Sequence, residues 1–145
     1  MVGRRRILGL VGAITLVTGA SVAAVVRPQQ AAASASGCVA HNGYEPSSCV
    51  QVQGTSTFVQ SVAGGVDLWA YHSSSGHFHV YGGGLDLTSA DATYQNNSFI
   101  KHTKWGPSFP VNRNLPDGSK VCANFVESKG GGYVEHPAAC ETIHR

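Results

Sequence analysis

The sequence has few charged residues and a single methionine. Asp, Glu, Lys and Arg together make up 12% of the 145 residues, and there are 18 glycines. Coiled coils and charged disordered tails need far more Glu, Lys or Arg, so this composition excludes both classes. From residue 48 onward, no window of 12 or more residues shows a clean helical period of 3.6. The length allows one domain.

The first 40 positions lack acidic residues and histidine, yet they hold four of the ten basic residues: Arg4, Arg5, Arg6 and Arg27. From Gly37 onward, six basic residues therefore stand against eight acidic ones, a formal net charge of −2, although the whole chain carries +2. Binding to nucleic acid requires clustered positive charge that neutralises phosphates. The sequence therefore argues against a nucleic-acid partner.

Residues 1–35 are typical of a secretory signal peptide. A basic stretch at 1–6 precedes a mostly apolar run at 7–26, and small residues at 31–36 offer A-x-A cleavage sites. Cleavage after Ala33 or Ala35 would leave a secreted, extracellular protein without membrane contact. The apolar run is long enough for the alternative of a retained membrane anchor, and the paired arginines permit export by the twin-arginine route. We expect an extended N-terminal segment with the first disulfide at 36–50 and a β-domain at 51–145.

Four cysteines remain after such a cleavage: Cys38, Cys49, Cys122 and Cys140. An even number in a short secreted chain indicates two disulfides, with three possible connectivities. We favour Cys38 with Cys49 and Cys122 with Cys140, because each pair is close in sequence and encloses turn-forming residues. No C-x-x-C motif occurs, and an oxidising compartment favours disulfides over zinc thiolates.

Apolar residues recur with period two from residue 48 onward, between Gly-rich breaks. This pattern predicts an all-β fold, a small disulfide-stabilised β-sandwich or barrel of about 7–9 short strands. We expect Gly64-Gly65 to turn the chain into a hairpin between 66–71 and 77–81. A second hairpin is expected between 109–113 and 120–126, across the Pro-Asp-Gly of 114–118.

Alternation assigns a core side to the first of these hairpins, formed by Val66, Leu68, Ala70, Phe78 and Val80. The opposite side then carries aromatic, imidazole and carboxylate groups, which suit a partner protein or a sugar ring. We predict this side as the binding face: Asp67, Trp69, Tyr71, His77, His79 and Tyr81. The alternative is that a second sheet covers this side, in which case Trp69 belongs to the core.

Signals for catalysis are weak. A G-x-S-x-G nucleophile elbow is absent, all four thiols have disulfide partners, and the glycines at 82–84 lack the Lys-Ser/Thr of a phosphate loop. His77 and His79 lie about 7 Å apart along a strand, a separation that a metal can bridge. Strand surfaces often carry such histidines as solvated groups, so we predict no metal. Because the catalytic motifs are missing, we also predict no enzyme activity and no cofactor.

Four stretches of the sequence resemble a family of small two-disulfide secreted proteins from filamentous actinobacteria such as Streptomyces. They are GHFHVYGGG at 76–84, WGP at 105–107, NRNLPDGSKVC at 112–122 and ACETI at 139–143. The family includes adaptor subunits of umbrella-shaped antibacterial toxin particles. The resemblance implies a non-catalytic adaptor that links a lectin-like subunit to a large, repeat-containing, toxin-carrying subunit, in competition between related bacteria. It also implies that the segment at 36–50 takes part in docking.

Two alternatives stay open. A free-standing carbohydrate-binding module would stack sugars on Trp69, Tyr71 and Tyr81. A secreted protease inhibitor of the streptomycete subtilisin-inhibitor type would also be small, β-rich and held by two disulfides. The sequence departs from that type, because the Cys-Pro motif of those inhibitors is missing near Cys122.

Overall fold

The computed structural model describes residues 34–40 and 43–145. The predicted signal peptide lies outside them except for its last two positions. Among the described residues, no helix has the length and hydrophobicity that crossing a bilayer requires.

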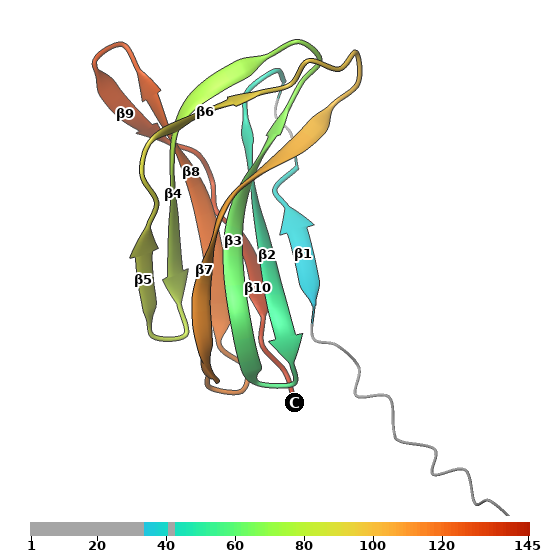
Figure 1. Ribbon diagram of the computed structural model, residues 1–145, viewed down its shortest axis with the longest axis vertical. Coiled ribbons are helices and arrows are strands. Elements are labelled where there is room, and N and C mark those ends of the chain that lie inside the picture. Colours follow the sequence, from blue (N-terminus) through green and yellow to red (C-terminus); the bar gives the residue numbers. More distant parts are fainter. Residues whose placement is uncertain (1–33, 41–42) are drawn as a thin grey trace, which may run out of the picture.

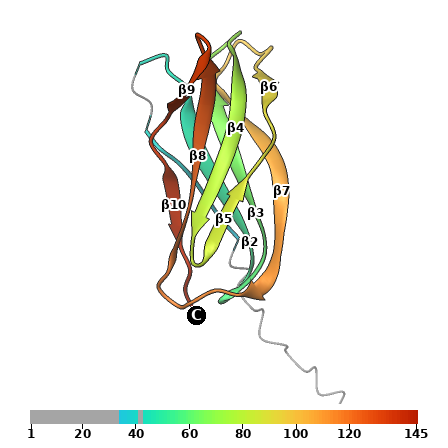
Figure 2. The same cartoon turned by 90° about the vertical axis from the view of Figure 1, so that its left-hand side faces the viewer.

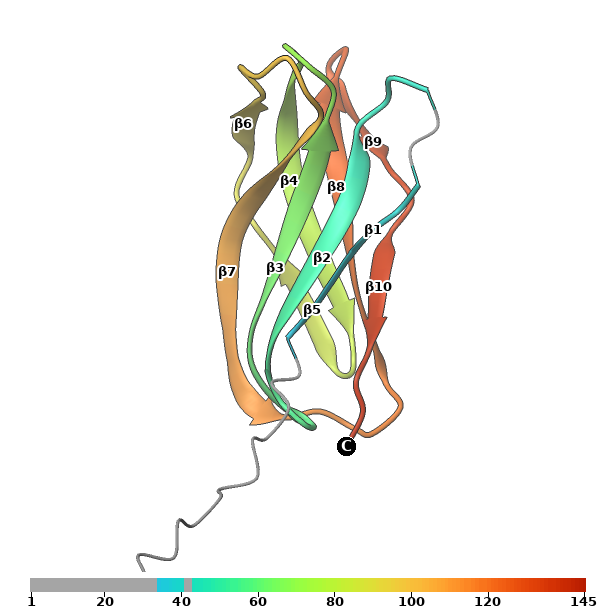
Figure 3. The same cartoon turned by 90° about the vertical axis from the view of Figure 1, so that its right-hand side faces the viewer.

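The described residues form two antiparallel sheets that pack face to face, and the predicted all-β, sandwich-like fold is confirmed (Figure 1). The first sheet, which faces the viewer in Figure 3, has the order β1-β2-β3-β7. Its strands are β1 (Ala35–Cys38), β2 (Ser47–Thr55), β3 (Phe58–Leu68) and β7 (His102–Asn114). Within the segment at 36–50, predicted to precede the β-domain, residues 36–38 lie in β1 and residues 47–50 in β2, so these parts belong to this sheet.

The second sheet, in front in Figure 2, has the order β10-β8-β4-β5. Two short strands extend it, since β6 pairs with the upper half of β4 and β9 pairs with the end of β8. Its strands are β4 (Ser73–Gly82), β5 (Leu85–Thr88), β6 (Ala92–Gln95), β8 (Lys120–Lys129), β9 (Gly132–Glu135) and β10 (Ala139–Thr142). The ten strands of the described part slightly exceed the predicted range.

Alternation predicted the core side correctly for four of five residues. Val66, Leu68, Phe78 and Val80 are all buried between the sheets, each at most 2% exposed. Ala70 is only half-buried, because β3 ends at Leu68 and Ala70 lies in the following loop. The core residues of β3 and β4 therefore face one another across the sandwich and are not neighbours within one sheet.

Both predicted hairpins are wrong. β3 continues through Gly64-Gly65 without a turn, and the loop at 69–72 carries the chain to the opposite sheet. The loop at 115–119 likewise joins β7 of the first sheet to β8 of the second. Period-two alternation states which side of a strand is buried, but a short loop can either fold back within a sheet or cross between sheets.

Both predicted disulfides are confirmed. Cys38 bonds to Cys49 and Cys122 bonds to Cys140, and no described cysteine is free. Each bond joins two residues that are directly opposite across neighbouring strands, β1 with β2 and β8 with β10. The disulfides therefore attach the first and last strands of the sandwich to their sheets. They are compatible with an oxidising extracellular compartment.

The strand directions gather the loops at two ends of the sandwich. The end far from the C-terminus carries the connections β1–β2, β3–β4 and β6–β7, together with the β8–β9 turn at 130–131 (Figure 1). We call three segments of the first three connections the apical loops: residues 43–46, 69–72 and 96–101. The opposite end carries the turns at 56–57 and 83–84, the loop at 115–119 and the C-terminus.

Candidate functional site

The apical loops expose large apolar side chains. Tyr44 is 74% exposed, Tyr71 72%, Phe99 78% and Ile100 56%, and these four come from three loops that are distant in sequence. In the described part of the chain, the other exposed large hydrophobic residues lie on strands and are 37–58% exposed. Single exposed apolar residues need no explanation, but a group of them at one end indicates an interaction surface.

Asn96 holds two of the apical loops together. The side chain is completely buried, and its Nδ2 lies 2.8–3.0 Å from three carbonyl oxygens, those of Leu68, Trp69 and Ile100. Its Oδ1 accepts a hydrogen bond from the backbone N–H of Ser98 at 3.0 Å. One carboxamide thus satisfies backbone groups of the 69–72 loop and of its own loop. Such bonds preorganise the exposed side chains that these loops carry.

Tyr71 has an uncommon backbone conformation for an aromatic residue. Its φ is 56°, in the left-handed region that residues with a β-carbon seldom occupy. The backbone N–H of Tyr71 donates to the carbonyl of Ser98 at 3.1 Å, and Asn96 N–H donates to the carbonyl of His72 at 2.8 Å. The neighbouring loop therefore holds Tyr71 in a conformation that turns its ring to solvent. Strained residues of this kind concentrate at functional sites.

An aromatic cleft lies beside these loops. The Tyr44 ring contacts Trp69 edge-on, with centroids 5.3 Å apart, and is stacked with the His72 ring at 6.4 Å. The Trp69 indole N–H donates to the carbonyl of Gly43 at 2.8 Å, so the β1–β2 loop is attached to the β3–β4 loop. The cleft has a volume of about 340 Å³, and Glu127 and Lys129 also line it.

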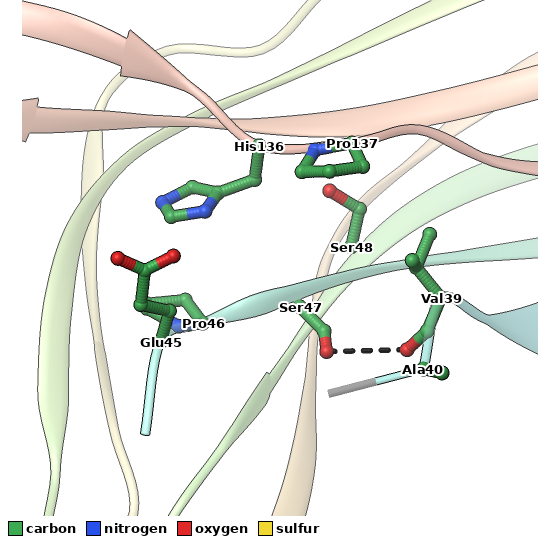
Figure 4. A pocket seen from close by; sticks show the side chains of 8 residues that line it. All are labelled: Val39, Ala40, Glu45, Pro46, Ser47, Ser48, His136 and Pro137. Carbon is green, nitrogen blue, oxygen red and sulfur yellow. Dashed lines mark hydrogen bonds between the residues drawn. The ribbon is translucent and has the colours of Figure 1, made fainter. Parts of the chain in front are cut away.

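A smaller pocket of about 90 Å³ adjoins the aromatic cleft and shares Glu45 with it. In Figure 4 the Glu45 carboxylate points toward the imidazole of His136, and Ser47 Oγ donates to the carbonyl of Val39 at 3.2 Å on the opposite side. His136 comes from the β9–β10 connection and is 8% exposed. The pocket therefore lies between the N-terminal part of the first sheet and the β9–β10 connection of the second sheet.

A buried polar network lies between the two pockets. Glu127 accepts hydrogen bonds from Ser74 Oγ at 2.7 Å and from His136 Nε2 at 3.0 Å. Burial acts to raise the pKa of Glu127, but these two bonds and the nearby Lys129 outweigh it and lower the pKa below its ordinary value. The Glu127 carboxylate therefore stays ionised although its side chain is only 13% exposed.

The six residues of the predicted binding face do not share one face, because β3 and β4 belong to different sheets. Asp67 is 6% exposed and forms an ion pair with Lys101 at 3.1 Å. Trp69 and Tyr71 are in an apical loop, where a binding role for them stays a prediction. His77, His79 and Tyr81 lie on the outer side of the second sheet, away from the core.

The two histidines of the second sheet are each bonded to a carboxylate. His77 Nδ1 lies 2.6 Å from Asp91, and His79 Nε2 lies 2.8 Å from Asp86. Tyr133 also donates to Asp91 at 2.6 Å. The hydrogen bonds from Tyr133 and His77 lower the pKa of Asp91. The bond between Tyr133 and Asp91 also raises the pKa of Tyr133. Within the described residues, no group of three or more His, Cys, Asp or Glu is placed to hold a metal ion.

Sequence reasoning missed Tyr44, Asn96, Phe99 and Ile100. A usable signal existed for two of them, because Phe99-Ile100 is an apolar pair next to a polar run at 89–98. Strand alternation buries only one of two adjacent residues, so such a pair is expected to leave one side chain exposed. Nothing in the sequence marks Asn96, whose partners belong to another loop. In comparisons with known proteins, no family model, curated protein or solved structure matches this chain.

Proposed function

We propose that the protein is a secreted, non-catalytic adaptor whose apical loops bind a protein partner. One observation carries this proposal: four exposed apolar side chains of the described residues lie at one end, on loops that hydrogen bonds hold together. Rigid, exposed Tyr and Phe rings provide contact area at a low entropic cost, as they do in antibody loops at the end of a β-sandwich. A protein surface that covers them would remove this apolar area from water.

The geometry near the apical loops also favours binding over catalysis. Ser74 lies beside the Glu127–His136 pair, but it is 6% exposed and donates its hydrogen bond to Glu127. A serine nucleophile requires the opposite arrangement, in which a histidine accepts the hydroxyl proton and a carboxylate orients the histidine. Here Glu127 lies between Ser74 and His136.

The resemblance to actinobacterial secreted proteins supplies the type of assembly. In this proposal the adaptor links a lectin-like subunit to a large toxin-carrying subunit of an extracellular antibacterial particle. An adaptor needs a second contact surface besides the apical loops. The β1 strand (Ala35–Cys38) is an edge of the first sheet and is attached to β2 by the Cys38–Cys49 bond, so this part of the segment at 36–50 can present a fixed edge to that second partner.

Affinity purification from the culture supernatant of the producing bacterium tests the proposal. The tagged mature protein should retain a lectin-like protein and a large repeat-containing protein in a fixed ratio at moderate salt. The double variant Phe99→Ser/Ile100→Ser should lose one of the two. The control Phe58→Ser, at the other end of the sandwich and 40% exposed, should keep both. Recovery of the wild-type protein alone would contradict the adaptor proposal.

A carbohydrate-binding module is the second candidate, because Tyr44 and Trp69 place aromatic rings beside a cleft of about 340 Å³. If the protein is such a module, polysaccharide in a native gel should retard its migration, and the Trp69→Ala variant should migrate without this retardation. The inhibitor alternative predicts that the mature protein slows a subtilisin-type protease. Neither result is expected from an adaptor.

A further inference from the structure

The aromatic cleft joins ring surfaces to negative charge. Tyr44 and Trp69 contribute rings, and Glu45 and Glu127 contribute carboxylates. Of the described residues that line it, only Lys129 is a lysine or arginine. Ring faces carry negative potential, so both kinds of wall attract a cation and disfavour an anion. The volume is in the range of pockets that hold one small ligand or one long side chain.

Among the described residues, the Glu127 carboxylate has three polar partners. Ser74 donates a hydrogen bond at 2.7 Å and carries no charge, and His136 donates one at 3.0 Å and carries charge only when it is protonated. The Lys129 ammonium lies 4.0 Å away, and its side chain is 69% exposed, so this ion pair is long and weakened by solvent. The contact nevertheless shows that an ammonium group can approach Glu127 through the cleft. A cation delivered by a partner would be less solvated there than Lys129 is.

We propose that the aromatic cleft binds a basic side chain, a lysine ammonium or an arginine guanidinium, presented by the partner protein. The proposal deepens the proposed function, on which it rests, by naming the chemistry that the partner must offer. The cation lies against the rings of Tyr44 and Trp69 and takes the place of Lys129 beside Glu127. The exposed side chains of Phe99 and Ile100, on another apical loop, then add apolar contact area outside the cleft that holds the charged anchor.

Nuclear magnetic resonance can test the cleft without the partner. The chain has two tryptophans, so a ¹⁵N-labelled sample gives two indole N–H signals, and Trp105→Phe assigns them. Trp69 lines the cleft, whereas Trp105 lies on the outer side of the first sheet against Gly65. N-acetyl-arginine methylamide and N-acetyl-lysine methylamide should shift the Trp69 signal with saturation and leave Trp105 unmoved. An equal shift with the neutral N-acetyl-norleucine methylamide, or no shift with any probe, would overturn the proposal.

Charge variants sharpen the test. Glu127→Gln can disturb the buried network, so Glu45→Gln, an exposed position, is the better substitution. It should weaken binding of the arginine probe by up to about fivefold, the range of one exposed ion pair. Lys129→Met removes the internal competitor and should tighten binding. The matched control Lys120→Met lies at the other end of β8 and should change nothing. Weaker binding of the arginine probe in Lys129→Met would show that Lys129 does not compete for the cation site and would overturn the proposal.

The two proposals fail separately. Phe99 and Ile100 do not line the cleft, so Phe99→Ser/Ile100→Ser should lose the partner and still bind the arginine probe. A probe that binds while no partner is recovered contradicts the adaptor alone. A partner that requires Phe99 while the probes leave Trp69 unmoved contradicts the basic anchor alone. Saturable shifts with methyl glycosides, and none with the basic probes, would assign the cleft to sugars.

Discussion

Phe78 of the second sheet packs directly on Gly64 of the first, so closely that a β-carbon on Gly64 would lie 2.6 Å from the ring. Gly106 on the neighbouring strand β7 leaves the same kind of space, with a β-carbon 2.4 Å from the ring. Phe78 is fully buried as a result. The two glycines therefore form a hollow for one aromatic ring, and this contact joins the sheets near the middle of the sandwich.

Gly64→Ala should destabilise the fold. The added methyl group overlaps a buried ring, and overpacking of this kind costs about 1–3 kcal/mol of the free energy of unfolding. Urea denaturation of the mature protein measures the loss. Gly132→Ala is the control, because a β-carbon there would meet no atom within 4 Å and should leave the midpoint unchanged.

The same contact predicts a coupling between the two positions. Phe78→Ala alone should cost about 3–5 kcal/mol, because it leaves a cavity in the core. In the Phe78→Ala background, Gly64→Ala should lose only part of its effect, since the overlapping ring carbons are gone while the β-carbon of residue 78, 2.7 Å from the added methyl group, remains. A double-mutant cycle from urea denaturation gives the coupling energy. Additive effects would show that the methyl group clashes with something else.

Asn96→Ala should destabilise the protein and also reduce partner binding. It removes the bonds to the carbonyls of Leu68, Trp69 and Ile100, of which the bond to Leu68 is buried, at a cost of about 1–3 kcal/mol. Thermal unfolding and partner capture measure the two effects. The exposed neighbour Asn97 provides the control, and Asn97→Ala should be close to wild type. A stable Asn96→Ala protein that lost binding would still support the role of these bonds in orienting the loops.

Acid should weaken the sandwich partly through Glu127. Burial by itself would raise the pKa of Glu127 above its ordinary value of 4.5. The hydrogen bonds from Ser74 and His136 outweigh burial, so the pKa is lowered in the folded state. A lowered pKa means that the stabilisation is complete above the unfolded value and is lost as the pH falls through the folded value. Glu127→Gln should therefore flatten the dependence of stability on pH below about 4.5. The exposed Glu135→Gln should leave that dependence as it is in the wild type.

The cysteine pairing predicts that the native mature protein has no thiol that reacts with an alkylating reagent. Four thiols should appear after unfolding and reduction, as mass spectrometry can count. Replacing Cys122 and Cys140 by serine should cost about 3 kcal/mol, because the unfolded chain then loses a closed loop. Labelling of any cysteine before reduction would contradict the pairing.

Part of the site could be predicted from the sequence. Strand alternation assigns Trp69 and Tyr71 to the side opposite the core and so predicts them for binding, and both lie in an apical loop. Their expected neighbours His77, His79 and Tyr81 lie elsewhere, because β4 is in the other sheet. Tyr44 joins Trp69 through a contact between loops 25 positions apart in sequence, which no local pattern records.

The sequence by itself determined the all-β class, the two disulfide pairs and the inner positions of β3 and β4. These features follow from local properties, namely residue spacing and the period of side chains along one strand. Only the tertiary structure decided which sheet each strand joins, why Gly64 continues a strand, and how Asn96 brings the apical loops together. The reason is that loop crossings and packing depend on contacts between segments that are distant in sequence. Phe78 illustrates this, since its hollow is made by glycines of two other strands.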